Sequence, residues 1–209
     1  MYAKICCAFV QGVEALWIDV ETDIAPGLPQ VNVVGLPDPA VRESVERVRA
    51  AVKNCGFQFP LRRITVNLAP ADLRKEGTAF DLAIAAGILV VSSQLDGGLF
   101  RGALVIGELA LSGEGRPVPG VLPMVELAKR RGIRRVLLPA GNAAEAALIG
   151  GLELFAVSHL SQLAGGDLDT LRFVPEAAGS GAPDADAAGP PHAELDFADV
   201  IGQPTAKRA

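Results

Sequence analysis

A charged loop that runs directly into an apolar segment holds the residues best placed to do chemistry. Residues 75–77, Lys-Glu-Gly, are followed by Thr78, and residues 82–91 carry no charged side chain. If 82–91 belong to a helix, backbone N–H groups at its start face the loop, and such groups can bind an anion or stabilise an oxyanion. The alternative is local: Gly77 and Thr78 cap the helix while Asp81 favours its positive end, and we favour this interpretation.

Two groups of basic residues are candidates for contact with nucleic acid. One flanks a predicted strand and the other surrounds the end of a predicted helix; they are Arg62, Arg63, Arg74 and Lys75, and Lys129, Arg130, Arg131, Arg134 and Arg135. Basic residues at a helix C-terminus also complement the helix dipole, and a charged face is often simply solvated. Aromatic residues are scarce near both groups in the sequence, apart from Phe57 and Phe59. Contact with phosphates is therefore a better hypothesis than recognition of bases.

Composition limits the other classes of function. Residues 1–174 hold 17 Lys and Arg against 18 Asp and Glu, whereas residues 175–209 hold 2 against 6, so no overall basic field favours nucleic acid. The three cysteines form no C-x-x-C motif, and His159 has no close partner, so we expect a structural His159, no metal site, no disulfide framework and a reduced, cytoplasmic setting. Residues 82–91 are about half of the roughly 20 apolar residues that a membrane-spanning helix needs, and we expect no membrane contact.

Hydrophobic periodicity predicts an α+β fold with a mixed sheet and packed helices. Three early strands, most simply arranged as a meander, are predicted at 3–10, 14–22 and 30–35. Asp38 can cap a helix that begins at Pro39, with Arg47 among its water-facing residues. Later strands and helices alternate, which indicates βαβ crossovers added to the meander. They are expected within 62–70, 73–93, 103–120, 121–132, 134–139, 142–150 and 152–158.

A boundary is predicted near residue 175. Residues 175–193 consist mainly of Pro, Gly, Ala and Asp without apolar periodicity, which is typical of a flexible, disordered linker. Residues 1–174 would form one domain, and residues 194–209 would open a second. The sequence contains no Gly-Lys dipeptide, so the phosphate-binding motif G-x-x-x-x-G-K-[ST] is absent. We therefore expect this chain neither to bind ATP tightly nor to hydrolyse it.

Several motifs carry a resemblance to known families. The loop KEGTAFDLAIAAG and the later segments GELALSGEGRPVPGVLP and AKRRGIRRVLLP resemble the proteolytic domain of Lon-type proteases and the Lon-like domain of the recombination protein RadA. More similar still is the N-terminal domain of the magnesium chelatase-like ATPases, the ComM/YifB family, over the run from MYAKI through GLPDPAVRESVERVRAAVKNCGF to RRVLLPAGN. The resemblance covers about residues 1–165 and 194–209. It implies a Lon-like domain of the ribosomal protein S5 domain 2-like fold.

The resemblance also predicts the loss of protease activity. Lon-type proteases use a Ser nucleophile that a Lys activates. When the shared motifs are matched, the Ser position falls on Ala79 and the Lys position on Pro123. The resemblance thus implies the fold without the dyad, and we expect no catalytic residue in this chain.

The end of the sequence resembles the opening of an AAA+ module. In DFADVIGQPTAKRA, the residues that would lie against the adenine ring are Val200, Ile201 and Gly202. The resemblance implies that the chain stops before the motor and that ATP and Mg²⁺ belong to the full-length protein. Its partners would be its own AAA+ module, other subunits of a hexameric ring and DNA. The implied process is DNA branch migration in natural transformation and recombination.

Two other functions are compatible with the sequence. A catalytically inactive Lon-like module could still bind peptides, which predicts an open groove along the strand before Thr78. The chain could also be a fragment of a chelatase-associated ATPase subunit, although true chelatase ATPase subunits do not begin with a Lon-like domain. DNA binding that weakens steeply with salt would favour the first hypothesis, because phosphate contacts release counterions.

Overall fold

Strands β1 (Tyr2–Gln11) and β2 (Glu14–Ala25) form an antiparallel hairpin in the computed structural model, which describes residues 2–175. The next strand in the sequence, β3 (Gln30–Val34), does not extend this hairpin. Instead β4 (Arg63–Ala69) lies between them, antiparallel to β2 and parallel to β3. The predicted meander is therefore wrong for its third strand, because the helix after β3 carries the chain back and lets β4 pair with both neighbours.

Helix α1 (Pro39–Asn54) confirms the predicted start. The Asp38 side chain accepts a hydrogen bond from the Val41 N–H at 2.7 Å, Pro39 is the first helical residue, and Cys55 is the C-cap. Proline suits this position because its missing N–H is one that the helix would leave unpaired. The apolar face of α1, which carries Val41, Val45, Val48 and Val52, is buried.

The second half of the chain builds parallel strands onto the hairpin. The sheet has the order β3-β4-β2-β1-β5-β8-β9, and β1, β5, β8 and β9 run parallel, which confirms the predicted crossovers. The remaining elements are α2 (Asp81–Val91), η1 (Gly97–Phe100), β5 (Ala103–Val105), β6 (Glu108–Leu109), β7 (Gly115–Arg116), α3 (Val121–Arg130), β8 (Arg135–Pro139), η2 (Ala140–Asn142), α4 (Ala143–Ala146), β9 (Glu153–Val157), η3 (Leu160–Gly165) and η4 (Asp169–Leu171).

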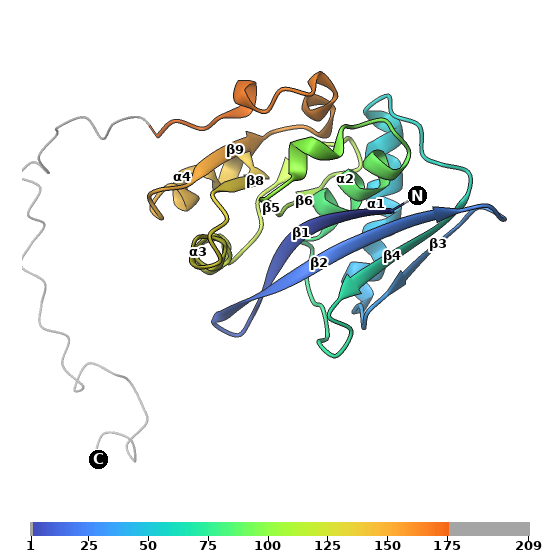
Figure 1. Cartoon of the computed structure of the whole chain (residues 1–209), viewed down its shortest axis with the longest axis horizontal. Helices are drawn as coiled ribbons and strands as arrows, with labels where there is room; N and C mark the ends of the chain where they lie inside the picture. The colour runs from blue at the N-terminus through green and yellow to red at the C-terminus, as the bar shows by residue number, and fades with distance from the viewer. Residues whose placement is uncertain (1, 176–209) are drawn as a thin grey trace, which may run out of the picture. The chain divides into compact units, whose positions relative to one another are not determined.

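The helices divide between the two faces of the sheet. In Figure 1, α1 and α2 lie behind β1, β2 and β4, whose front face carries no helix over most of its length. Helix α3 packs against β1 and β2 from the other side. Its first residue is preceded by Gly120, where a Cβ would lie only 2.6 Å from Cγ2 of Val10. Val10 alternates along β1 with Phe9, which faces the core, so α3 covers the outward face near the hairpin turn.

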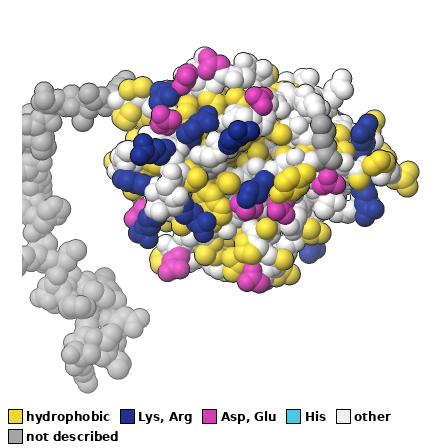
Figure 2. Space-filling view, in the orientation of Figure 1, with side chains coloured by type: hydrophobic (Ala, Val, Ile, Leu, Met, Phe, Trp, Pro, Cys, Tyr) yellow, Lys and Arg dark blue, Asp and Glu magenta, His cyan; other side chains and the backbone are white. Residues whose placement is uncertain are grey.

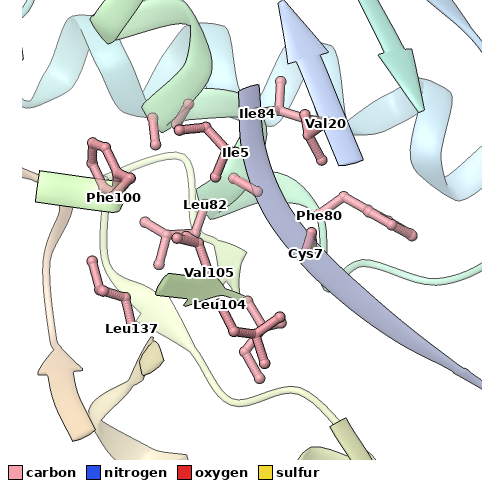
Figure 3. Packing of buried hydrophobic residues seen from close by; sticks show 14 of the residues in the cluster. Ile5, Cys7, Val20, Phe80, Leu82, Ile84, Phe100, Leu104, Val105 and Leu137 are labelled. Atoms are coloured by element: carbon pink, nitrogen blue, oxygen red, sulfur yellow. The ribbon is translucent and has the colours of Figure 1, made fainter. Parts of the chain in front are cut away.

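The core lies between the sheet and α2. Almost every residue of α2 is buried, as expected for a helix without a polar face. The rings of Phe9 and Phe80 lie 5.6 Å apart, centroid to centroid. Figure 3 shows side chains from β1, β2, α2, η1, β5 and β8 that meet in this core, among them Ile5, Val20, Leu82, Phe100, Leu104 and Leu137.

No helix within residues 2–175 combines the length and the apolar composition that crossing a bilayer requires. The predicted linker, apart from Pro175, and the segment 194–209 lie outside the described residues.

Candidate nucleic-acid interface

The position expected to hold a protease nucleophile is closed into the core. Ala79 is 7% exposed, and its carbonyl oxygen accepts hydrogen bonds from the Gly107 N–H at 2.9 Å and the Cys7 thiol at 3.7 Å. At the start of α2, the Leu82 N–H donates to the Gly107 carbonyl at 3.0 Å. The Leu82 N–H, one of the backbone groups that could have held an anion, is therefore used within the fold.

The prediction that Gly77 and Thr78 cap this helix is wrong. Phe80 is the N-cap residue of α2 and no side chain caps the helix, so Gly77 and Thr78 do not have the predicted role. Asp81 is buried, and the N–H of Leu109 donates to its carboxylate at 3.2 Å. Its second partner is Arg47, which was expected to face water and is instead largely buried.

The two positions matched to the dyad lie in different parts of the fold. Ala79 precedes α2, and Pro123 lies half-buried in the first turn of α3. A methyl group cannot act as a nucleophile, and a proline ring within a chain has no amine proton to transfer. Neither side chain can perform Ser-Lys chemistry.

Lys75 does not belong to the candidate interface, because its side chain is buried. The side chain is fully buried, and its ammonium group donates hydrogen bonds to the carbonyl of Leu73 at 2.7 Å and to that of Pro70. Desolvation lowers the pKa of Lys75, and the nearby Asp72 opposes this effect. The amine holds the loop after β4 together and does not reach the surface.

The other members of the first basic group are exposed but separated. Arg62 and Arg63 lie at the start of β4, where Arg62 borders a cavity of about 870 Å³ that Phe57 and Phe59 also line. Arg74 follows the opposite end of β4, and its Nε lies 3.4 Å from the Glu76 carboxylate. Seven residues of extended strand separate the two places by roughly 20 Å, so this group does not form one surface.

The second basic group lies around the end of α3 and the start of β8. Lys129 and Arg130 form the last turn of α3, Arg131 is its C-cap, and Arg134 and Arg135 lead into β8 after one glycine turn. All but Arg135 are exposed, and Arg135 is half-buried. Figure 2 shows Lys and Arg side chains gathered over the part of the surface formed by α3, β8 and β9. We call the residues of the second group the α3-end cluster.

Contacts within the fold leave much of this positive charge available. Arg130 pairs with Glu126 at 2.6 Å, one helical turn away, and remains 73% exposed. The Arg135 guanidinium lies over the Phe155 ring at 5.4 Å, and Arg172 lies over the same ring at 5.5 Å. Arg172 adds little free charge to this surface, because it pairs with Asp169 at 2.9 Å and with Glu153 at 3.5 Å.

Sequence reasoning missed an aromatic residue at this surface, Trp17. The guanidinium carbon of Arg131 lies 5.0 Å from the centre of the Trp17 ring. The indole N–H donates to Asp19 at 3.1 Å. The alternation of side chains along β2 predicts that Trp17 and Asp19 lie on the same face of the sheet. It does not show which helix approaches that face.

A second cluster, unrelated to the basic surface, joins Cys55 to His159. The Cys55 sulfur lies 3.9 Å from Nδ1 of His159, whose Nε2 lies 3.1 Å from the Ser112 carbonyl oxygen. His159 also caps η3 by accepting a hydrogen bond from the Ser161 N–H, which confirms its predicted structural role. Burial raises the pKa of the Cys55 thiol, so the thiol is not activated as a nucleophile.

The residues expected to lie against an adenine ring, Val200, Ile201 and Gly202, are outside the described residues.

Comparison with known proteins identifies relatives over nearly the whole chain. The family model for subunit ChlI of Mg-chelatase matches residues 20–142. An uncharacterized protein of Mycobacterium tuberculosis is 40% identical over 209 residues, which cover 96% of this chain and 38% of that protein. YifB of Salmonella typhimurium is 40% identical over 197 residues, 94% of this chain and 37% of YifB. Competence protein ComM of Haemophilus influenzae is 39% identical over 201 residues, 95% of this chain and 38% of ComM. The chain thus spans less than two fifths of the length of these relatives.

Proposed function

Because the chain belongs to the magnesium chelatase-like family that includes ComM and YifB, we propose that it is the non-catalytic N-terminal domain of an AAA+ ATPase that processes DNA. Its part would be to contact DNA phosphates through the α3-end cluster. The observation that carries this proposal is that five basic residues lie around the end of α3 and that four of them are exposed. The name of the competence protein among the relatives agrees with a DNA substrate.

The proposal includes a fold and a cellular setting. We infer a Lon-like domain of the S5 domain 2-like type that acts in the cytoplasm, in branch migration during transformation and recombination. The mixed sheet with α1 and α2 on one face supports the fold assignment. Neighbouring subunits of a hexameric ring and the AAA+ module would be the protein partners.

We infer that residues 2–175 do not hold ATP or Mg²⁺. The sequence has no G-x-x-x-x-G-K-[ST] loop. The start of α2, where a loop enters a helix, is closed by the hydrogen bond between Leu82 and Gly107. We therefore assign nucleotide chemistry to the part of the longer relatives that this chain does not span.

The peptide-binding alternative has less support. It requires an open groove along the strand before Thr78, which is β4. Strand β4 pairs with β2 on one side and with β3 on the other, so neither of its edges can accept a peptide strand. No observation favours a chelatase subunit over a DNA-contacting domain.

The salt dependence of DNA binding tests the proposal. We expect the 209-residue chain to bind a fluorescent DNA duplex at low salt, with log Kobs falling linearly against log salt concentration. Arg130→Ala combined with Arg131→Ala should weaken binding and reduce the slope by nearly 2, because about 0.9 counterion is released for each phosphate contact.

Arg62→Ala combined with Arg63→Ala is the matched control, since it removes the same charge from an exposed site at another place. The control should have a much smaller effect on binding, and both double variants should melt at nearly the wild-type temperature. Equal losses in the two double variants would show that charge alone matters and not the α3-end cluster. If the chain does not bind DNA even at low salt, the proposed contact is wrong.

A further inference from the structure

A cavity of about 440 Å³ lies on the outward face of the sheet, between the end of α3 and the loop after β4. Apolar side chains form much of its wall, including Leu16, Pro70 and Leu73. Trp17 and Arg131 line it together with Asp19. The volume falls within the range of about 300–1,000 Å³ that is usual for small-ligand sites.

We propose that this cavity takes an unpaired base of single-stranded DNA, which stacks against Trp17 and Arg131 while the adjoining phosphates contact the rest of the α3-end cluster. The inference rests on the proposed function and adds the strand state of the DNA and the means of holding it. It also replaces the expectation that only phosphates are contacted, which assumed that no suitable aromatic residue was near.

The chemistry of Trp17 and Arg131 suits a base. Nucleobases present flat π surfaces, and proteins that bind single strands stack them on aromatic rings or on arginine guanidinium planes. Here the guanidinium carbon already lies over the indole ring, 5.0 Å from its centre, so the two flat groups are neighbours before any ligand arrives. Trp17 is only partly buried, which leaves part of its ring accessible.

Asp19 holds the indole in place without repelling the DNA backbone. One carboxylate oxygen accepts a hydrogen bond from the Trp17 indole N–H at 3.1 Å, and the other accepts one from the Lys4 ammonium group at 3.0 Å. The negative charge of Asp19 is therefore compensated by Lys4, while the hydrogen bond fixes the orientation of the ring.

A base site in this cavity should favour single-stranded DNA over a duplex. In a duplex the bases are stacked and paired, so a base has to leave the stack before it can enter a pocket. In a single strand that cost is small. Arg130 is the residue next to Arg131 at the end of α3 and its side chain is 73% exposed, so it can contact a phosphate next to an inserted base.

The intrinsic fluorescence of the chain tests the inference directly, because Trp17 is the only tryptophan in the sequence. The 209-residue chain is titrated at low salt with an oligothymidylate of about 12 nucleotides, with an abasic oligonucleotide of the same length and charge, and with a duplex. We expect saturable quenching by the oligothymidylate and little change with the other two. The oligothymidylate should also bind on the order of ten-fold more tightly than the abasic strand.

Variants separate stacking from folding. Trp17→Leu should lose on the order of ten-fold in affinity for the oligothymidylate and leave the affinity for the abasic strand unchanged. Trp17→Phe retains a ring and should recover most of the loss. Phe59→Leu is the matched control, because Arg49 lies over the Phe59 ring at 5.1 Å in the same kind of pair elsewhere.

The outcomes distinguish this inference from the proposed function. If the oligothymidylate binds without changing the fluorescence, or if the abasic strand binds as tightly, the base site is wrong and the phosphate contact stands. If no DNA binds, both are wrong. The comparison of the three DNA ligands uses the unmodified chain, so it holds even if Trp17→Leu fails to fold.

Discussion

The Arg47 guanidinium lies against the Asp81 carboxylate, with Nε 2.8 Å from one oxygen and Nη2 3.0 Å from the other. Arg47 belongs to α1, and Asp81 is the first residue of α2. The Asp81 side chain is fully buried, and that of Arg47 is 20% exposed. Burial raises the pKa of Asp81 and the hydrogen bonds from Arg47 oppose the rise, while the hydrogen bond to Asp81 raises the pKa of Arg47. This pair joins the two helices that cover one face of the sheet.

Removal of one partner of this pair should be costly. We expect Arg47→Ala to lower the free energy of unfolding by about 3–5 kcal/mol, because it leaves a buried carboxylate without its counter-charge. Arg42→Ala, on the exposed side of the same helix, should change it by less than about 0.5 kcal/mol. Urea denaturation followed by circular dichroism measures both, and similar values for the two variants would contradict the buried ion pair.

Gly35 should tolerate no side chain. Its φ is +95°, and a Cβ there would lie 2.2 Å from the carbonyl oxygen of Leu68. Gly12 also has a positive φ, +65°, but a Cβ there would meet nothing within 4 Å. We therefore expect Gly12→Ala to cost about 1–2 kcal/mol from backbone strain alone, and Gly35→Ala to cost more than about 3 kcal/mol because the backbone has to move.

Thermal melting of the two glycine variants side by side separates strain from collision. Equal melting temperatures would show that the close approach of Gly35 to β4 is not a constraint on the fold.

Lys75→Met should destabilise the chain, because the carbonyls of Pro70 and Leu73 lose their donor. The expected cost is about 1–3 kcal/mol.

The contribution of Lys75 to the stability of the fold should also depend on pH. Since burial lowers the pKa of Lys75 in the folded state, the unfolded chain binds more protons in the window below about pH 10.4, and the contribution of Lys75 to stability increases as the pH rises through that window.

Urea denaturation at about pH 7 and about pH 10 checks this sign. The stability of the wild type relative to Lys75→Met should increase at the higher pH. Lys53→Met, at an exposed lysine in the last turn of α1, should show no such trend. A relative stability that falls with pH would contradict the burial of the Lys75 ammonium.

The rate at which each thiol is labelled should depend on its burial and, for Cys6, on the charge of Asp19. Cys7 is fully buried and should react with Ellman's reagent only after unfolding. Cys6 is partly buried, and its pKa is raised by desolvation and by the Asp19 carboxylate. Because the thiolate is the reactive form, Cys6 should react slowly at neutral pH and faster as the pH rises.

Asp19→Asn removes a negative charge next to Cys6 and should accelerate the labelling of Cys6. Cys55, whose raised pKa comes from burial, is the internal control and should keep its rate. An unchanged rate at Cys6 would mean that Asp19 does not act on this thiol.

Local patterns predicted much of the fold. Asp38 and Pro39 mark the start of α1 because capping needs only neighbouring residues, and the absence of charge in α2 predicts its burial. Alternation shows which face of a strand is buried, but not which strands are neighbours, so the insertion of β4 beside β2 was not predictable. The contact between Trp17 and Arg131 depends on the packing of α3 against β2, which no local pattern records.

Strand β1 lies in the middle of the sheet, where Cys6 pairs with Leu104 of β5. A ribosome that adds about 5–20 residues per second needs on the order of 5–20 s to proceed from one of these residues to the other. For that interval β1 and β2 can close their hairpin, but the second edge of β1 has no partner. An unpaired edge invites pairing with another chain. The nascent protein is therefore most vulnerable to wrong association before β5 emerges, and a chaperone that covers β1 during this interval would protect it.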